Sequence, residues 1–302
     1  MSEARKGILA MIGACVIWGL SPLFFKALRH VPPIEILAHR TVWAFLFFCV
    51  VLRVQGRLGE MPRLLLMSPA RVAVAAVMIS ANWFVYIWAI QVGHGIEASL
   101  GYYLFPLVAV LLGATVFRER LDRTQWFAVG LAAVAVALLS FGLKVVPVVS
   151  LVLAGTFGFY GMIKKGLDAG PVVSVTAEVA ILLPIALAWL AWRYGQTANF
   201  PYSTGTAAML FLSGTAYTAI PLMLFTYAAR RARLVTIGLV QYLNPTLQFL
   251  CATLVFAEPF TLWHAMAFGL IWAALALYSG HAMAVERAVR KRSIRFPTSG
   301  TV

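Results

Sequence analysis

Long apolar stretches alternate with short polar connections along almost the whole chain. A helix needs about 20 apolar residues to cross the hydrocarbon core of a bilayer. Stretches of about this length predict ten transmembrane helices, at residues 7–28, 33–52, 71–92, 97–117, 124–143, 147–163, 172–192, 205–228, 234–256 and 262–283. Proline favours the first turn of a helix, where its missing N–H would have no helical partner. Pro33, Pro171 and the pair Ser68-Pro69 therefore suit helix starts.

The two halves of the sequence resemble each other. The motif Tyr103-Leu-Phe-Pro106 returns 139 residues later as Tyr242-Leu-Asn-Pro245. This repeat predicts a duplicated protein with five helices in residues 1–143, five in residues 144–283 and a basic tail at 284–302. Because five is odd, the second half must enter the membrane from the opposite side. Inverted repeats of this kind are typical of secondary transporters, in which the substrate site lies near the midplane between the halves.

The composition agrees with a chain surrounded by lipid. Of the 302 residues, 62% are hydrophobic and 11% are charged, and the mean hydropathy is +0.89. Soluble domains carry about 25% charged residues, so this chain could not cover a surface exposed to water. We therefore expect an all-α polytopic membrane protein, with the lipid bilayer rather than nucleic acid as the partner of its net charge of +14.

The basic residues are distributed unevenly between the two sides of the predicted bundle. With the N-terminus inside, 19 of the 24 Lys and Arg residues fall on the cytoplasmic side, four fall on the other side, and Arg40 lies within a helix. Cytoplasmic loops are enriched in Lys and Arg. Both termini are therefore predicted to be cytoplasmic.

No pattern in the sequence indicates a metal or a cofactor. The three cysteines each lie inside an apolar stretch, without the spacing of a disulfide framework or a metal site. A phosphate-binding glycine loop of the form G-x-x-x-x-G-K-[ST] is absent from the sequence. We therefore expect no cofactor and no ATP hydrolysis. Any coupling must come from an ion gradient, with protons as the candidate, or from the gradient of the substrate.

Arg40 and Glu178 are ionisable residues inside apolar helices, each seven residues after a proline that begins its helix. They are repeat counterparts of opposite charge, at depths of about 10 Å from opposite faces, so a direct salt bridge is not assured. Ionisable groups inside a membrane normally face protein or a water-filled cavity. In a functional role, Arg40 would anchor an anionic substrate group and Glu178 would bind a proton or cation. A structural role for both remains the alternative.

Three further sets of charged residues have competing interpretations. Glu35 and His39 share a helix face and could form a proton relay, although a hydrogen-bonded pair near the interface is favoured. Glu97 is expected to cap the helix that it opens. Glu119 and Glu258 are expected to cap the helices that follow them rather than to contact substrate.

The ninth predicted helix carries a polar face formed by Gln241, Asn244 and Gln248. The counterpart in the first half consists of Tyr102, Phe105 and Ala109. Together these faces would form an amide-rich wall and an aromatic wall around an amphipathic organic molecule. Hydrogen bonding between helices is the alternative, and we favour the cavity.

Other candidate lining residues are Trp18, Ser21, Asn82, Trp83, Tyr86, Tyr103, Tyr160 and Tyr242. Aromatic residues also anchor helices at the membrane interface, which is the alternative for some of them. Pro106 and Pro245 each remove one backbone donor inside a helix. They are predicted to be hinges, with a fixed bend required for packing as the alternative.

Several of these stretches resemble a known family: Glu35-Ile-Leu-Ala-His39-Arg40, Asn82-Trp83, Glu97-Ala-Ser-Leu-Gly-Tyr102-Tyr-Leu-Phe-Pro106-Leu and Gln241-Tyr-Leu-Asn-Pro245-Thr. They are similar to RarD-type permeases of the EamA branch of the drug/metabolite transporter superfamily. The resemblance spans essentially the whole chain, with Phe105 standing where the family pattern favours a polar residue such as asparagine. It implies a bacterial inner-membrane permease and leaves the substrate undefined.

The sequence thus predicts a secondary permease or exporter, not an enzyme, that moves a small organic metabolite or drug by alternating access. A flippase for a lipid-linked small molecule is one alternative, and it would need a lateral opening between helices. A polytopic membrane enzyme is the second alternative. For an enzyme, only His39 with Glu35 offers an acid–base pair.

Overall fold

The computed structural model describes residues 2–116, 118, 121–144, 146–195 and 200–295, and the backbone alone of 234, 235, 282 and 285–295. The described residues form helices α1 (Glu3–Gly19), α2 (Ser21–Ala27), α3 (Pro33–Val54), α4 (Glu60–Met67), α5 (Pro69–Val92), α6 (Gly95–Val116), α7 (Arg123–Leu143), α8 (Val148–Lys165), α9 (Pro171–Tyr194), α10 (Thr204–Gly214), the π-helix η1 (Thr215–Ala219), α11 (Ile220–Ala229), α12 (Leu234–Gln241), α13 (Leu243–Leu250), the π-helix η2 (Cys251–Val255) and α14 (Leu262–Arg295).

The prediction of an all-α polytopic membrane protein is confirmed. Within the described part of the chain, nine helices are long and apolar enough to cross a membrane. The remaining predicted span, 234–256, is divided into α12, α13 and η2. Its interruption at Tyr242 lies three residues before Pro245, which cannot donate to the carbonyl of Gln241. The total of ten spans and the inverted relation of the halves stay predictions.

Local signals account for most helix boundaries. Pro33 and Pro171 each occupy the start of a helix, as predicted. Pro69 begins α5, but Ser68 makes no side-chain cap there. The connection before Pro69 contains α4, which the apolar pattern did not predict.

The basic tail predicted at 284–302 begins as a helical extension of α14 to Arg295. Its side chains from residue 285 onward, and residues 296–302, lie outside the described part. Glu119 also lies outside the described residues.

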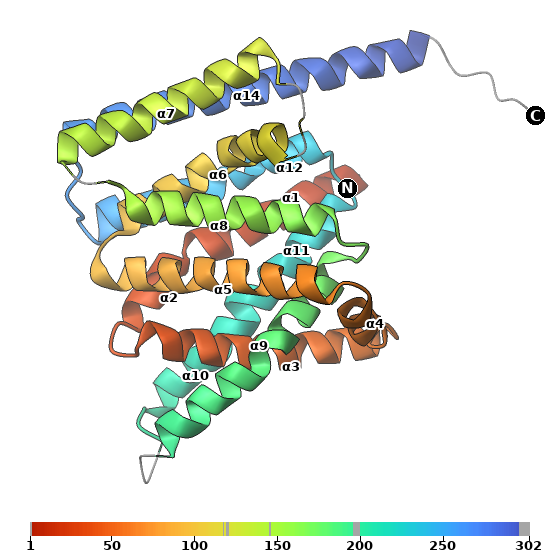
Figure 1. The fold of residues 1–302 in the computed structure, drawn as a ribbon, viewed down its shortest axis with the longest axis vertical. Coiled ribbons are helices and arrows are strands. Elements are labelled where there is room, and N and C mark those ends of the chain that lie inside the picture. Colours follow the sequence, from red (N-terminus) through yellow and green to blue (C-terminus); the bar gives the residue numbers. More distant parts are fainter. Residues whose placement is uncertain (1, 117, 119–120, 145, 196–199, 296–302) are drawn as a thin grey trace, which may run out of the picture.

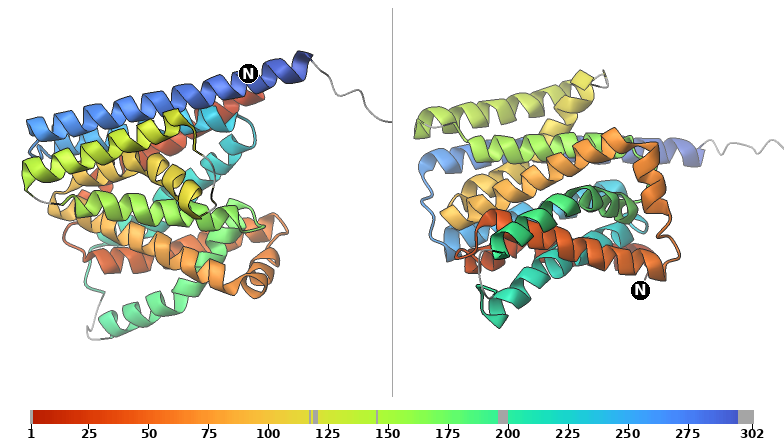
Figure 2. Two further views of the ribbon diagram at one scale, coloured as in Figure 1. Left: turned by 45° about the horizontal axis from the view of Figure 1, so that its top comes forward. Right: turned by 60° about the horizontal axis from the view of Figure 1, so that its bottom comes forward.

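Helices from the two halves pack against each other throughout the bundle (Figures 1 and 2). The principal pairs are α1 with α11, α3 with α9, α5 with α8, α6 with α8 and with α13, and α7 with α14. The pair α7 and α14 lies along one side of the bundle in Figure 1. The interleaving places residues distant in sequence around a common centre.

The bundle has two ends, which we name by their landmarks. At the α4 end, α1, α5 and α9 begin and α3 and α8 finish. This end lies on the right in Figure 1, where the N-terminus and α4 are labelled. At the opposite end, the Glu258 end, α3 and α6 begin and Glu258 follows η2.

The contact between α6 and α8 depends on a glycine. A Cβ atom added to Gly101 would lie 2.8 Å from the carbonyl oxygen of Ser150 and 2.9 Å from Cβ of Leu153. Both distances are too short for real contacts, so the two helices can approach this closely only because Gly101 has no side chain. Close approach through small residues is a general means of packing helices in membranes.

We expect Gly101→Ala to lower the free energy of unfolding by about 1–3 kcal/mol, the usual cost of overpacking a close contact. Gly130→Ala is a matched control, because a Cβ there would meet nothing within 4 Å. The control should be neutral or should stabilise by up to about 1 kcal/mol, through helix propensity. Thermal unfolding of the purified variants in detergent measures both effects. Equal behaviour of the two variants would contradict the packing argument.

Candidate functional site

A central cavity of about 710 Å³ lies among the helices of both halves. It is lined by 30 residues, of which twelve are aromatic. Fifteen of them were singled out from the sequence: Trp18, Ser21, Arg40, Asn82, Trp83, Tyr86, Tyr102, Phe105, Pro106, Tyr160, Gln241, Tyr242, Asn244, Pro245 and Gln248. Glu35, His39, Tyr103 and Glu178 were also singled out and do not line it.

Arg40 lies on α3 with only 5% of its surface exposed, and it lines the cavity. Its guanidinium carbon lies 4.1 Å from the ring centroid of Trp83 and 5.8 Å from that of Phe25. The Nε atom is buried without a hydrogen-bond partner. No carboxylate of the described residues lies within 4.0 Å of the guanidinium. Arg40 is therefore held by stacking on aromatic rings, and its charge is not balanced by an ion pair.

Glu178 has a different environment from the isolated carboxylate that the sequence suggested. Its Oε1 atom lies 2.5 Å from Nζ of Lys164, and the hydroxyl of Tyr160 donates to Oε2 at 2.9 Å. Lys164 also donates to the hydroxyl of Ser174. Glu178 is fully buried, whereas Lys164 and Tyr160 reach the cavity. The carboxylate is thus neutralised within the protein and separated from the cavity by one layer of side chains.

Lys164 is the main charged residue that sequence reasoning misplaced. It was counted with the cytoplasmic connections, but α8 extends to Lys165, and Lys164 bonds inward to Glu178. The available signal was Glu178 itself, because a buried carboxylate requires a partner. Phe25, Phe157 and Tyr278 also line the cavity. Their apolar surroundings in the sequence gave no reason to select them.

The predicted amide and aromatic walls both border the cavity. Gln248 is buried. Its Nε2 atom donates to Oδ1 of Asn244 at 2.9 Å, and its Oε1 atom has no hydrogen-bond partner. Phe105 packs against Phe157 with ring centroids 4.7 Å apart, so the departure from the family pattern adds to the aromatic wall. Ala109 does not reach the cavity.

Asn82 lines the cavity and links three helices, α5, α6 and α8. Its amide nitrogen donates to the carbonyl of Leu153 and to Thr156, both at 3.0 Å, and its oxygen accepts from Tyr102 at 2.9 Å. Its hydrogen-bonding capacity is therefore largely used within the protein. A similar contact joins the hydroxyls of Ser21 and Tyr86 at 2.7 Å, between α2 and α5.

Glu35 and His39 lie near the Glu258 end and are joined through Tyr194. Nε2 of His39 lies 2.8 Å from the Tyr194 hydroxyl, which donates to Oε1 of Glu35. Arg193 lies 3.6 Å from the other oxygen of Glu35. Burial, followed by the negative charge of Glu35, raises the pKa of nearby Tyr202 to about 12. The pair thus belongs to a hydrogen-bonded cluster away from the cavity.

Tyr103 packs in the core between α6, α13 and α14. Its hydroxyl lies 2.6 Å from that of Thr246, and its ring contacts Phe268 and Trp272. Its repeat counterpart Tyr242 faces the cavity instead.

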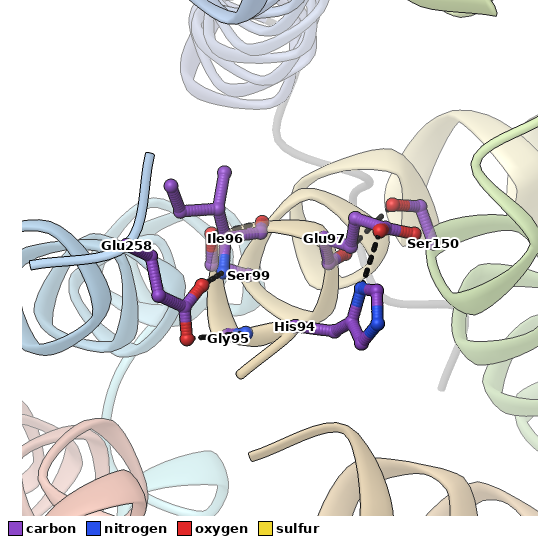
Figure 3. Close-up of polar contacts among 7 residues, drawn as sticks. All are labelled: His94, Gly95, Ile96, Glu97, Ser99, Ser150 and Glu258. Atoms are coloured by element: carbon purple, nitrogen blue, oxygen red, sulfur yellow. Dashed lines mark hydrogen bonds and ion pairs between the residues drawn. The ribbon is translucent and has the colours of Figure 1, made fainter. Parts of the chain in front are cut away.

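The start of α6 is capped from the other half of the chain (Figure 3). The two carboxylate oxygens of Glu258 accept from the backbone N–H groups of Gly95 and Ile96, each at 2.9 Å. Glu97 instead contacts His94 at 2.7 Å. The expectations that Glu97 caps this helix and that Glu258 caps the following one were therefore wrong. A carboxylate satisfies free N–H groups from any segment that can reach them.

Comparison with known proteins identifies the family of this chain. Residues 5–141 match the EamA-like transporter family. The chain is 39% identical to an uncharacterized transporter, YojE, of Bacillus subtilis, over 95% of this chain and 98% of that protein. The chain belongs to the EamA family, in its RarD-type branch.

Two further relatives carry the name RarD. One from Streptomyces exfoliatus is 42% identical over 96% of this chain and 93% of its own length. One from Escherichia coli is 38% identical over 96% of this chain and 99% of its own length. A solved crystal structure of a protein shares the fold, with a TM-score of 0.56 and 18% identity over 90% of this chain and 96% of that one. This EamA protein is therefore a multi-pass membrane transporter.

Lys164→Met should leave Glu178 as an uncompensated buried charge. We expect a loss of about 3–5 kcal/mol in the free energy of unfolding, toward the lower value because Lys164 is partly exposed. Lys164→Met combined with Glu178→Gln should recover at least half of that loss. Thermal unfolding in detergent measures both proteins. A double variant no more stable than Lys164→Met would contradict a direct ion pair.

Glu258→Ala should release the two N–H groups at the start of α6. Loss of a helix cap costs about 0.5–2 kcal/mol, so backbone amides in residues 95–100 should exchange with deuterium about 2–30 times faster. Glu97→Ala is the control, because that side chain contacts His94 and caps no backbone N–H. Mass spectrometry of peptides from this region measures the rates. Unchanged exchange in Glu258→Ala would show that the cap contributes little.

Proposed function

We propose that this EamA protein is a secondary transporter of small organic molecules in the bacterial inner membrane, acting by alternating access of its central cavity. The observation that carries the proposal is the cavity of about 710 Å³ between the two halves. Its volume is within the range of small-molecule sites. Its walls contain residues from both repeats, which is where inverted-repeat transporters hold their substrates.

The cavity extends toward one end of the bundle only. Its lining includes Lys164 and Pro171, at the end of α8 and the start of α9. Toward the Glu258 end it stops near Arg40, seven residues into α3, or about 10 Å from the helix start. The cavity thus reaches the α4 end and is separated from the other end by about two helical turns.

Hydrogen bonds to the backbone close the Glu258 end. Gln91 donates to the carbonyls of Leu28 and Val31 at 3.0 and 3.1 Å. Lys26 donates to the carbonyls of Ile90 and Gln91 at 3.3 and 3.4 Å. Together with the Glu258 cap, these bonds hold the helix ends against one another. An opening at this end would have to break them.

The packing of helices supports an exchange of roles between the halves. Under the sequence repeat, α1 corresponds to α8, and α5 corresponds to the segment from α10 to α11. The packing of α1 on α11 and the packing of α5 on α8 are therefore equivalent contacts. In pairs such as α3 with α9, the two helices are repeat counterparts of each other, so the repeat maps the contact onto itself. Such a bundle could close one end and open the other by exchanging the conformations of its halves.

The distribution of positive charge supports a cytoplasmic location for the α4 end. Removing Lys164, which is paired with Glu178, from the count leaves 18 basic residues on that side against four on the other. Since basic loops stay in the cytoplasm, both termini would be cytoplasmic, and the structure would represent an inward-facing state.

The lining chemistry favours binding over catalysis. Its charged groups among the described residues are Arg40 and Lys164, and it includes neither a carboxylate nor an imidazole. General acid–base catalysis most often uses a histidine or a carboxylate near the substrate. We therefore favour transport over enzymatic activity.

Glu178 and Lys164 are the proposed site of proton coupling. Glu178 is buried beside the cavity, and Lys164 is shared between Glu178 and the cavity wall. A substrate or conformational change that moved Lys164 away would leave the carboxylate charged and unpaired, which favours uptake of a proton. Movement of substrate would then be linked to movement of a proton.

The test is transport in liposomes that contain a pH-sensitive dye, with a panel of amino acids and amphipathic drugs. We expect a substrate-dependent proton signal from the unmodified protein, and its loss in Glu178→Gln with substrate binding retained. Glu60→Gln is the control, because Glu60 is an exposed carboxylate on α4 paired with Arg57. Substrate movement without a proton signal, together with an active Glu178→Gln variant, would indicate a facilitator and a structural role for Glu178.

A further inference from the structure

The buried guanidinium of Arg40 is the feature of the cavity that the protein leaves without a counter-ion. We propose that Arg40 binds the carboxylate of the substrate, and that the substrate is an organic monoanion with an aromatic body. This inference rests on the proposed transport function and assigns its substrate class. It is carried by the position of Arg40, the charge of the cavity and the nature of its walls.

The contact of Arg40 with Trp83 leaves the donors of the guanidinium available. The guanidinium carbon lies over the Trp83 ring, 4.1 Å from the ring centroid. A cation–π contact is an attraction between the charge and the ring, and it forms no hydrogen bond with the N–H groups. None of them is hydrogen-bonded to a described residue. A planar fork held by an aromatic ring matches the two oxygens of a carboxylate.

The charge balance indicates one negative charge on the ligand. The two charged side chains in the lining are both cations. Lys164 is already neutralised by Glu178 at 2.5 Å, whereas Arg40 has no such partner among the described residues. A monoanion would therefore neutralise the cavity. A cationic ligand would add a second uncompensated charge, and a dianion would leave an excess negative charge.

The walls indicate an aromatic body. Twelve of the 30 lining residues are aromatic, including Phe105 and Phe157. Aromatic rings stabilise one another in tilted and offset contacts. The cavity of about 710 Å³ accommodates a bicyclic ring system.

Three ligands with the same ring system test the assignment: 2-naphthoate, 2-naphthamide and 2-naphthylmethylamine. Their carboxylate, neutral amide and ammonium groups differ in charge while the aromatic body is unchanged. Calorimetric titration at pH 7 of the purified protein in detergent should show 2-naphthoate binding at least tenfold more tightly than the amide, and the amine binding most weakly. Equal affinity for the acid and the amide, or no binding of 2-naphthoate, would overturn the proposal.

Variants of Arg40 locate the effect. Arg40→Met should reduce the affinity for 2-naphthoate at least tenfold and leave the affinity for the amide within threefold. Arg40→Lys should retain part of the preference for 2-naphthoate over the amide, because lysine keeps the positive charge but lacks the paired donors of the guanidinium. Arg29→Met removes a positive charge from an exposed position outside the cavity and should change neither affinity. A preference that survives in Arg40→Met would exclude Arg40 as the anchor.

Liposome counterflow of labelled 2-naphthoate separates this inference from the proposed function. Tight, Arg40-dependent binding without counterflow would support the binding site and overturn transport. Counterflow of the amide and the acid at equal rates, with equal affinities, would support transport and overturn the substrate class. Since the comparison of three ligands uses the unmodified protein, it stands even where an Arg40 variant does not fold.

Discussion

The cost of placing charge in a bilayer governs the interior of this EamA protein. An ionisable group there must be paired, hydrogen-bonded or turned toward a polar cavity. Glu178 meets this requirement with Lys164 and Tyr160, which compensate it within the protein. Arg40 meets it only in part, because stacking on Trp83 fixes its position but leaves its charge unbalanced. The charge of Glu178 is thus balanced within the protein, whereas Arg40 can receive a charged ligand.

The same constraint applies to the backbone at the ends of the helices. The first N–H groups and last carbonyls of each helix have no partner within that helix. At the Glu258 end, Glu258 caps α6, while Lys26 and Gln91 donate to carbonyls at the ends of neighbouring segments. Groups that complete one helix thus come from another. At this end, the groups that satisfy the backbone of one segment also hold it against its neighbours.

The two proline motifs illustrate the limit of local prediction. Pro106 and Pro245 occupy matching places in the repeat and remove the same backbone donor. Nevertheless, α6 is continuous through Pro106, whereas the second segment is interrupted at Tyr242. The beginning of α6 is fixed by Glu258 and by Ser150, which donates to the carbonyl of Glu97 at 2.7 Å. A proline predicts a weakened helix, and the surrounding contacts decide whether the helix breaks.

The sequence alone determined the membrane class, most span boundaries and many lining residues, because the length of apolar stretches and the position of prolines are local properties. It also indicated Arg40, since a charge inside an apolar stretch is costly wherever the helix lies. Only the tertiary structure paired Glu178 with Lys164, assigned the cap of α6 to Glu258 and turned Tyr103 into the core. These contacts join residues distant in the chain. Their distances and directions depend on how the helices pack, which hydrophobic periodicity does not specify.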